Sequence, residues 1–197
     1  MPNLIFITHP EVAIDPAVPV PHWALSPTGR SRMEAFARRP IVRTVEAVAC
    51  SNERKARDGA EILAAHRALP IIVDPELGEN DRSATGYIAP PEFWEVVDAF
   101  FAHPTRSVRG WERAVDAQAR IVRAVTRLAE DRAVEGDIAV VSHGGVGSLL
   151  LAHLTGAPDA RPCAQPHQAG GCFLSIDRKS MTLDHGWRTI DRDAIAS

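Results

Sequence analysis

The sequence predicts an α/β fold, a three-layer sandwich in which helices flank a mostly parallel central sheet. Short apolar runs alternate with helical patterns, and the runs lack the polar alternation of a half-exposed strand. The chain has 197 residues, of which 45% are hydrophobic, enough to bury one sizeable core. We therefore expect a single domain over residues 1–197.

Four apolar runs are predicted to be buried strands. They cover residues 4–8, 47–51, 71–73 and 138–142. Residues 172–176 and 181–183 are expected to form a terminal hairpin. In such a sheet, ligands bind at the carboxyl ends of the parallel strands.

The segments between these strands have helical patterns. The first helix should begin after Ser26, whose hydroxyl can cap it while Pro27 occupies its first turn, and should stop by Pro40. Further helices are expected over residues 54–66, 93–102, 111–130 and 146–154. Residues 89–109 are a candidate lid insertion.

Charge and composition limit the classes of partner. The net charge is −3 and no basic block is present, so we expect no nucleic-acid binding. No apolar run approaches the roughly 20 residues of a membrane span, so we expect no membrane association. The three cysteines are widely spaced and no signal-peptide pattern precedes them, which favours the cytoplasm.

Two histidines directly follow predicted strands. His9 comes directly after the run 4–8. His143 comes directly after the run 138–142 and precedes two glycines. Both therefore lie at the ligand-binding edge of the predicted sheet. The backbone N–H groups from Gly144 onward begin a helix, where the dipole favours an anion. We expect one anion pocket that contains both histidines.

A third strand end supplies positive charge. Arg54 lies in the first turn of the helix that follows residues 47–51. A cation there opposes the helix dipole unless an anion lies nearby, so Arg54 is expected to face the anion. Lys55 and Arg57 are expected to be solvated.

A fourth strand end supplies carboxylates. Glu79 follows residues 71–73 and is predicted to be a proton donor whose pKa is raised by partial burial. Glu76 and Asp81 are the competing carboxylates.

Taken in order, these motifs resemble the histidine phosphatase superfamily, which includes the cofactor-dependent phosphoglycerate mutases. The motifs are strand-His9, Leu25-Ser26-Pro27-Thr28-Gly29, Ser51-x-x-Arg54-x-Ala56, Leu77-x-Glu79 and Val141-Ser142-His143-Gly144-Gly145. The resemblance implies a phosphoglycerate mutase-like fold and a phosphomonoester hydrolase. It also implies that His9 is the nucleophile that becomes phosphohistidine, that His143 and Arg54 stabilise the phosphoryl group, and that Glu79 protonates the leaving oxygen.

This chemistry is consistent with the residues themselves. A neutral imidazole is a competent nucleophile near pH 7, and its second nitrogen can donate to a backbone carbonyl that sets the tautomer. The remaining work is to position and neutralise three charged oxygens. We therefore expect no metal and no cofactor, and a small phosphorylated molecule or inorganic phosphate as the ligand.

The sequence departs from the family pattern beside the nucleophile. The family has Arg-His-Gly where this chain has Thr8-His9-Pro10, and Thr8 lacks the bidentate fork of arginine. Asp15 lies where many members have asparagine, and its carboxylate would repel phosphate. The residues expected to bind phosphate are Thr8, Arg54 and Gly144. Because the usual arginine is missing, we expect weak phosphatase activity. Candidates to supply the missing positive charge are Arg30, Arg32 and Arg82.

Two alternatives to an active phosphatase remain. The first is a catalytically impaired family member that binds a phosphorylated or other anionic ligand without turnover, as the change at Thr8 suggests. The second is a different enzyme class. A zinc deaminase is one example, because His9-Pro10-Glu11 fits the His-x-Glu half of that signature. Its other half is missing, since the segment at Pro162-Cys163 has one cysteine where two are required.

Overall fold

The central sheet has six strands in the order β3-β2-β4-β1-β5-β6 in this computed structural model, which describes residues 1–191. The strands are β1 (Asn3–Thr8), β2 (Val45–Cys50), β3 (Ile71–Val73), β4 (Asp137–Ser142), β5 (Cys172–Asp177) and β6 (Leu183–Thr189). Strands β1 to β4 pair with one another in parallel. Strand β5 pairs antiparallel with β1, and β6 pairs antiparallel with β5. The predicted mostly parallel α/β sheet is confirmed.

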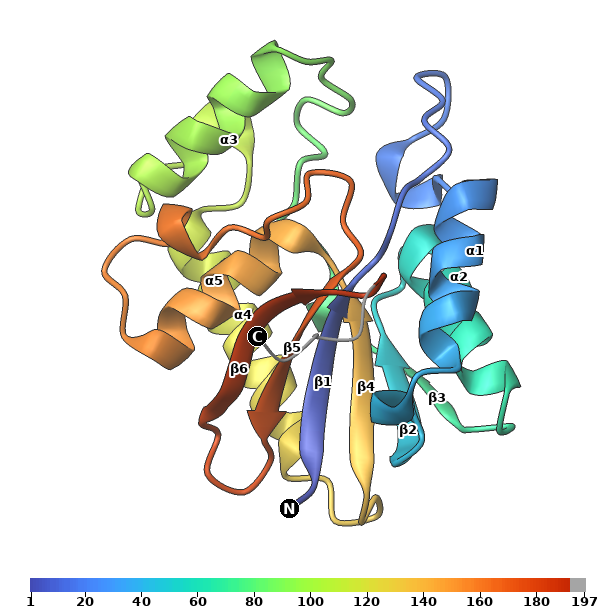
Figure 1. Ribbon diagram of the computed structural model, residues 1–197. Coiled ribbons are helices and arrows are strands. Elements are labelled where there is room, and N and C mark those ends of the chain that lie inside the picture. Colours follow the sequence, from blue (N-terminus) through green and yellow to red (C-terminus); the bar gives the residue numbers. More distant parts are fainter. Residues whose placement is uncertain (192–197) are drawn as a thin grey trace.

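Helices cover both faces of this sheet. They are α1 (Pro27–Ala37), α2 (Arg54–Ala65), α3 (Glu92–Ala102), α4 (Ala114–Ala129) and α5 (Gly144–Thr155). Helices α1 and α2 lie on one face, whereas α4 and α5 lie on the other, and α3 lies beyond the carboxyl edge of the strands (Figure 1). The sandwich therefore has three layers, as the sequence predicts.

Strand β1 shows why the apolar runs are continuous. Leu4 and Phe6 pack into the core on the α4–α5 side, and Ile5 and Ile7 pack into the core on the α1–α2 side. Successive side chains of a strand point to opposite faces, and here both faces are covered.

Most helix boundaries follow the local signals in the sequence. Ser26 caps α1, because its hydroxyl accepts a hydrogen bond from the Gly29 N–H at 3.0 Å. Gly156 ends α5 in the left-handed conformation, with φ of 66°. Helix α4 begins at Ala114 rather than at Trp111, which follows a short 3-10 turn and is buried.

Two strand predictions need correction. Strand β3 is not buried, because it is the outermost strand and leaves Ile71 40% and Val73 48% exposed. The second strand of the terminal hairpin runs over Leu183–Thr189, so the predicted segment 181–183 mostly forms the turn. That strand lies at the other edge of the sheet and is only half buried, so it lacks the apolar run on which the prediction relied.

Candidate active site

The register of two neighbouring strands brings His9 and His143 together. Thr8 of β1 pairs with Ser142 of β4, so the two histidines follow paired residues at the carboxyl edge of the sheet. Their ring centroids are 5.2 Å apart, and the rings are arranged edge to face. The structure thus places both histidines at one site, as the strand-end argument predicts.

His9 has the tautomer that a nucleophile requires. Its Nδ1 lies 2.9 Å from the Pro10 carbonyl oxygen, which can only accept, so Nδ1 carries the proton and Nε2 keeps its lone pair. Burial, together with the nearby His143 and Lys55, lowers the pKa of His9 to about 3. His9 is therefore a neutral imidazole near pH 7, and its side chain remains partly exposed.

His143 is fully buried behind it. Its Nε2 lies 2.8 Å from the Ser51 hydroxyl and 3.4 Å from Glu53 Oε1. Its Nδ1 is buried and has no hydrogen-bond partner within residues 1–191. Burial is the main cause that lowers the pKa of His143.

Glu53 and Lys55 form an ion pair beside His143. The Lys55 ammonium, whose side chain is 6% exposed, contacts Glu53 Oε2 and donates to the Val20 carbonyl at 3.0 Å. Burial opposes ionisation of Glu53, but His143 and Lys55 outweigh it and lower the pKa of Glu53 to about 2. The expectation that Lys55 is solvated is therefore wrong, because its side chain is buried, and no pattern in the sequence indicates Glu53.

Arg54 does not face the histidines, contrary to the expectation from its position at the strand end. Its side chain is 62% exposed, and its Nε donates to Asp58 one helical turn away at 2.7 Å. Successive helix residues point about 100° apart, so the α2 residue that faces the histidines is Lys55. The positive charge of Lys55 at the start of α2 is thus neutralised by a carboxylate of the chain itself, that of Glu53.

Glu79 occupies the start of α5. Its carboxylate accepts hydrogen bonds from the N–H groups of Gly145 and Val146, each at 3.0 Å, and lies 3.4 Å from the Arg82 guanidinium. Burial raises the pKa of Glu79, but Arg82, His143 and the Gly145 N–H outweigh it and lower that pKa overall. The expected upward shift is therefore wrong, because helix donors and a cation surround the carboxylate.

The backbone of Glu79 is held by Arg120 of α4. This guanidinium donates to the carbonyl oxygens of Glu76, Gly78 and Glu79 at 2.7, 3.0 and 3.2 Å. Neither competing carboxylate lies with the histidines: Glu76 pairs with arginines of α4, and Asp81 accepts from the Ser83 N–H at 2.8 Å.

Thr8 is engaged by the protein itself. Its hydroxyl accepts from the Cys172 N–H at 3.0 Å and donates to Gln165 Oε1 at 2.7 Å. The Gly144 N–H, by contrast, makes no hydrogen bond within residues 1–191. Of the two expected phosphate-binding groups that lie beside the histidines, the Thr8 hydroxyl is used within the protein and the Gly144 N–H is free in this part of the chain.

Among the ion pairs within residues 1–191, one of the three candidate compensating arginines pairs with a carboxylate beside the histidines. Arg82 lies against Glu79, whereas Arg32 pairs with Glu11 and Asp191, and Arg30 lies 3.8 Å from Asp58. The Asp15 carboxylate is exposed and accepts from the Ala17 N–H at 2.9 Å. The described cluster therefore combines two cations, Lys55 and Arg82, with two carboxylates, Glu53 and Glu79.

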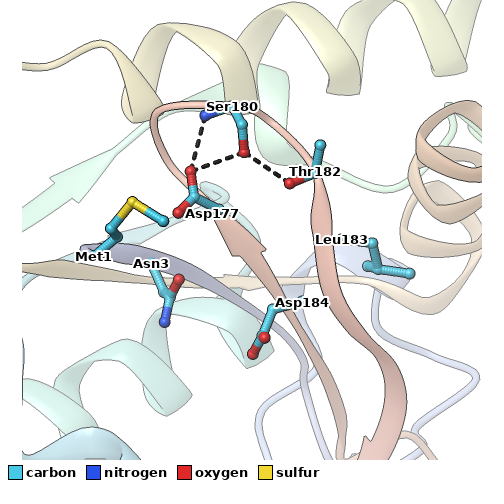
Figure 2. A pocket seen from close by; sticks show the side chains of 7 residues that line it. All are labelled: Met1, Asn3, Asp177, Ser180, Thr182, Leu183 and Asp184. Carbon is cyan, nitrogen blue, oxygen red and sulfur yellow. Dashed lines mark hydrogen bonds between the residues drawn. The ribbon is translucent and has the colours of Figure 1, made fainter.

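A concavity lies at the end of the sheet opposite to the histidines. It is a shallow hollow of about 400 Å³ near Asn3, where β1 begins, and it includes the turn between β5 and β6 (Figure 2). Hydrogen bonds from Ser180 to Asp177 stabilise that turn. Strand β1 separates this hollow from His9.

Residues 1–191 contain no group of three or more histidine, cysteine, aspartate or glutamate side chains that could hold a metal ion. In the same range, no helix is long and apolar enough to cross a membrane.

The sequence of this chain is similar to a known protein family and to a known phosphatase. Residues 18–185 match the histidine phosphatase superfamily (branch 1), a span that begins after Thr8-His9-Pro10. The adenosylcobalamin/α-ribazole phosphatase of Escherichia coli is 31% identical in an alignment over 144 residues, which covers 66% of this chain and 66% of that protein.

Solved structures match over almost the whole chain. The complex of a mycobacterial glucosyl-3-phosphoglycerate phosphatase with inorganic phosphate has a TM-score of 0.79 at 22% identity, and covers 98% of this chain and 100% of that one. The same phosphatase with VO3 has a TM-score of 0.74 at 22% identity, and covers 96% and 100%. At this identity, these two matches establish the shared fold.

Proposed function

The chain belongs to the histidine phosphatase superfamily, and from this premise we propose that it is a metal-independent phosphomonoester hydrolase acting through a phosphohistidine on His9. The observation that carries the proposal is the His9 ring. The Pro10 carbonyl holds the proton on Nδ1, so the lone pair on Nε2 is free beside His143. A small phosphorylated molecule is the substrate, in keeping with relatives that are phosphatases.

In the first step, Nε2 of His9 attacks the phosphorus atom and the bond to the ester oxygen breaks. Glu79, protonated while substrate is bound, gives its proton to the leaving alkoxide. Its pKa is lowered in the free site, and a phosphoryl group bound close by raises it through like-charge repulsion.

In the second step, Glu79 removes a proton from water, which attacks the phosphorus atom and breaks its bond to Nε2. Inorganic phosphate and neutral His9 are the products, so the two steps use the same carboxylate in opposite directions.

The phosphoryl oxygens need donors that are already in place. We assign this role to the Gly144 N–H, to His143, and to the two cations Lys55 and Arg82. Lys55 takes the role expected of Arg54, because Arg54 faces Asp58 and solvent. When Nε2 of His143 accepts from the Ser51 hydroxyl, the buried Nδ1, which has no partner within residues 1–191, carries the proton and can donate it to a phosphoryl oxygen.

Residues 89–109 are proposed to act as a lid. They contain α3, which lies beyond the carboxyl edge of the sheet where the histidines are (Figure 1). Arg82 connects this segment to the site, since its guanidinium lies 5.3 Å from the Phe93 ring. It also lies 4.7 Å from the ring of Trp111, which follows the segment.

A second candidate function is binding of an anion without turnover. The observation that favours it is the balanced charge of the site. Glu53 already pairs with Lys55, and Glu79 already accepts the N–H groups that begin α5. A phosphoryl group must compete with these carboxylates for the same donors.

The deciding experiment is hydrolysis of p-nitrophenyl phosphate by the wild type and by His9→Ala, with trapping of acid-labile phosphate on the protein. His153→Ala is the matched control, because His153 is an exposed histidine on α5. We expect activity and acid-labile phosphate in the wild type and the control, and neither in His9→Ala. If none of the three proteins hydrolyses any member of a phosphomonoester panel, but vanadate still raises their melting temperature, the binding function is established instead.

A further inference from the structure

Gln165 lies across the ends of the two strands that carry the histidines. Its Oε1 accepts a hydrogen bond from Thr8, the residue before His9, at 2.7 Å. Its amide also packs over Gly144, the residue after His143, so closely that a Cβ at Gly144 would lie 2.4 Å from Gln165 Nε2. One side chain, 157 positions along the chain from Thr8, thus contacts both strand ends at the site.

The hydrogen bonds of Thr8 set the orientation of this amide. The Thr8 hydroxyl accepts from the Cys172 N–H and has one hydrogen to give. Its distance to Gln165 Oε1, 2.7 Å, is typical of an O–H···O bond, whereas the Cys172 carbonyl is 3.3 Å away. The hydrogen therefore points to Gln165 Oε1, and the Nε2 hydrogens face away from Thr8.

The remaining end of the amide is a donor without an acceptor. Gln165 is partly exposed, and within residues 1–191 its Nε2 makes no hydrogen bond. The Gly144 N–H next to it also makes none in this range. Two unused donors thus lie together beside His9 and His143, where the proposed reaction places the phosphoryl oxygens.

We propose that Gln165 is a substrate-binding residue whose Nε2 donates a hydrogen bond to a non-bridging phosphoryl oxygen, with Thr8 as the residue that orients it. The inference rests on the proposed function and deepens it. Thr8 does not itself contact phosphate in this arrangement, because its single hydrogen is used by Gln165. A neutral donor beside His9 adds no positive charge to a cluster in which two cations already face two carboxylates.

Four variants test the proposal. Gln165→Glu keeps the size and the acceptor toward Thr8 but replaces the donor by a negative charge, and Gln168→Glu adds the same charge at an exposed position of the same loop. Thr8→Val removes the orienting hydroxyl, whereas Thr8→Ser keeps it. The readouts are kcat and KM for p-nitrophenyl phosphate, the vanadate inhibition constant, and the melting temperature with and without vanadate.

We expect Gln165→Glu to lower kcat/KM about 10²-fold, as for loss of a preorganised donor, and to abolish the vanadate-induced rise in melting temperature. The melting temperature without ligand should change little, because the Thr8 contact is kept. Gln168→Glu and Thr8→Ser should stay within about twofold of the wild type, and Thr8→Val should lose about tenfold, corresponding to one hydrogen bond of ordinary strength.

Wild-type vanadate affinity and turnover in Gln165→Glu would overturn the role of Gln165. A wild type that binds vanadate without turnover still tests the proposal through the vanadate constants of the variants. A wild type that neither hydrolyses the ester nor binds vanadate would refute the proposed function first, and the role of Gln165 with it.

Discussion

The Glu79 carboxylate accepts the N–H of Gly145 at 3.0 Å and so fills the start of α5 with a charge from the chain itself. The glycines after His143 indicate an anion position there, and the structure shows which anion occupies it. At the start of α2, a second internal carboxylate, that of Glu53, neutralises the side chain of Lys55. We therefore expect an external anion to compete with these internal carboxylates for the cations of the site.

Replacing Glu79 should affect both stability and turnover. Glu79→Gln removes a charged acceptor and turns an amide NH2 toward one of the N–H groups of α5, so the free energy of unfolding should fall by about 1–3 kcal/mol. Loss of the proton donor should lower kcat by about 10²-fold or more. Urea unfolding and steady-state kinetics measure the two effects, with Glu76→Gln as the control. Undiminished kcat in Glu79→Gln would assign the proton transfer to another group.

Lys55 and Arg54 should behave differently although they are adjacent. Lys55→Met should raise the phosphate inhibition constant at least tenfold, because it removes the buried cation of the cluster. Arg54→Met should leave that constant within about twofold, because Arg54 is exposed and paired with Asp58. The opposite ranking of the two variants would restore Arg54 as the phosphate-binding residue.

Lys55→Met also leaves the buried Glu53 carboxylate without its cation, so reduced stability could account for weaker binding. The double variant Lys55→Met/Glu53→Gln removes both charges. It should recover most of the melting temperature without recovering phosphate affinity, which separates binding from folding.

The strand ends that build the site could be predicted from the sequence, because each histidine follows a continuous apolar run and parallel runs end at one edge. The direction of individual side chains could not. Arg54 and Lys55 are both basic, and the pattern Arg54–Asp58–Glu61 at helical spacing was the signal that Arg54 lies on a polar stripe. Gln165 carries no signal in the sequence, since its contact with Thr8 depends on a loop between α5 and β5 that has no periodic pattern.

The lowered pKa of His9 predicts an unusual acid limb for catalysis. A histidine with the ordinary pKa of 6.5 would become protonated, and lose its nucleophilic lone pair, as the pH falls through 6.5. His9, with a pKa of about 3, stays neutral down to much lower pH. The second ionisation of a phosphate ester has a pKa of about 6, and the balanced charge of the site favours binding of the singly charged ester.

We therefore expect kcat/KM at pH 5 to equal or exceed kcat/KM at pH 7. A pH–rate profile, with circular dichroism at each pH to exclude unfolding, provides the measurement. A tenfold decrease for each pH unit below 6.5 would show that His9 titrates with an ordinary pKa in the free enzyme.

Gly170 should be required for the position of His9. Its φ is +74°, and a Cβ there would lie 2.0 Å from the His9 carbonyl oxygen. Gly170→Ala therefore combines backbone strain of about 1–2 kcal/mol with a steric clash at the residue that carries the nucleophile. Gly156→Ala is the matched control, because its φ is +66° and its Cβ would meet nothing within 4 Å. Both variants should lose stability in urea unfolding, but only Gly170→Ala should lose kcat/KM, by tenfold or more, because the His9 backbone must move. Equal activity of the two variants would mean that the loop around Gly170 yields to the new Cβ while His9 stays in place.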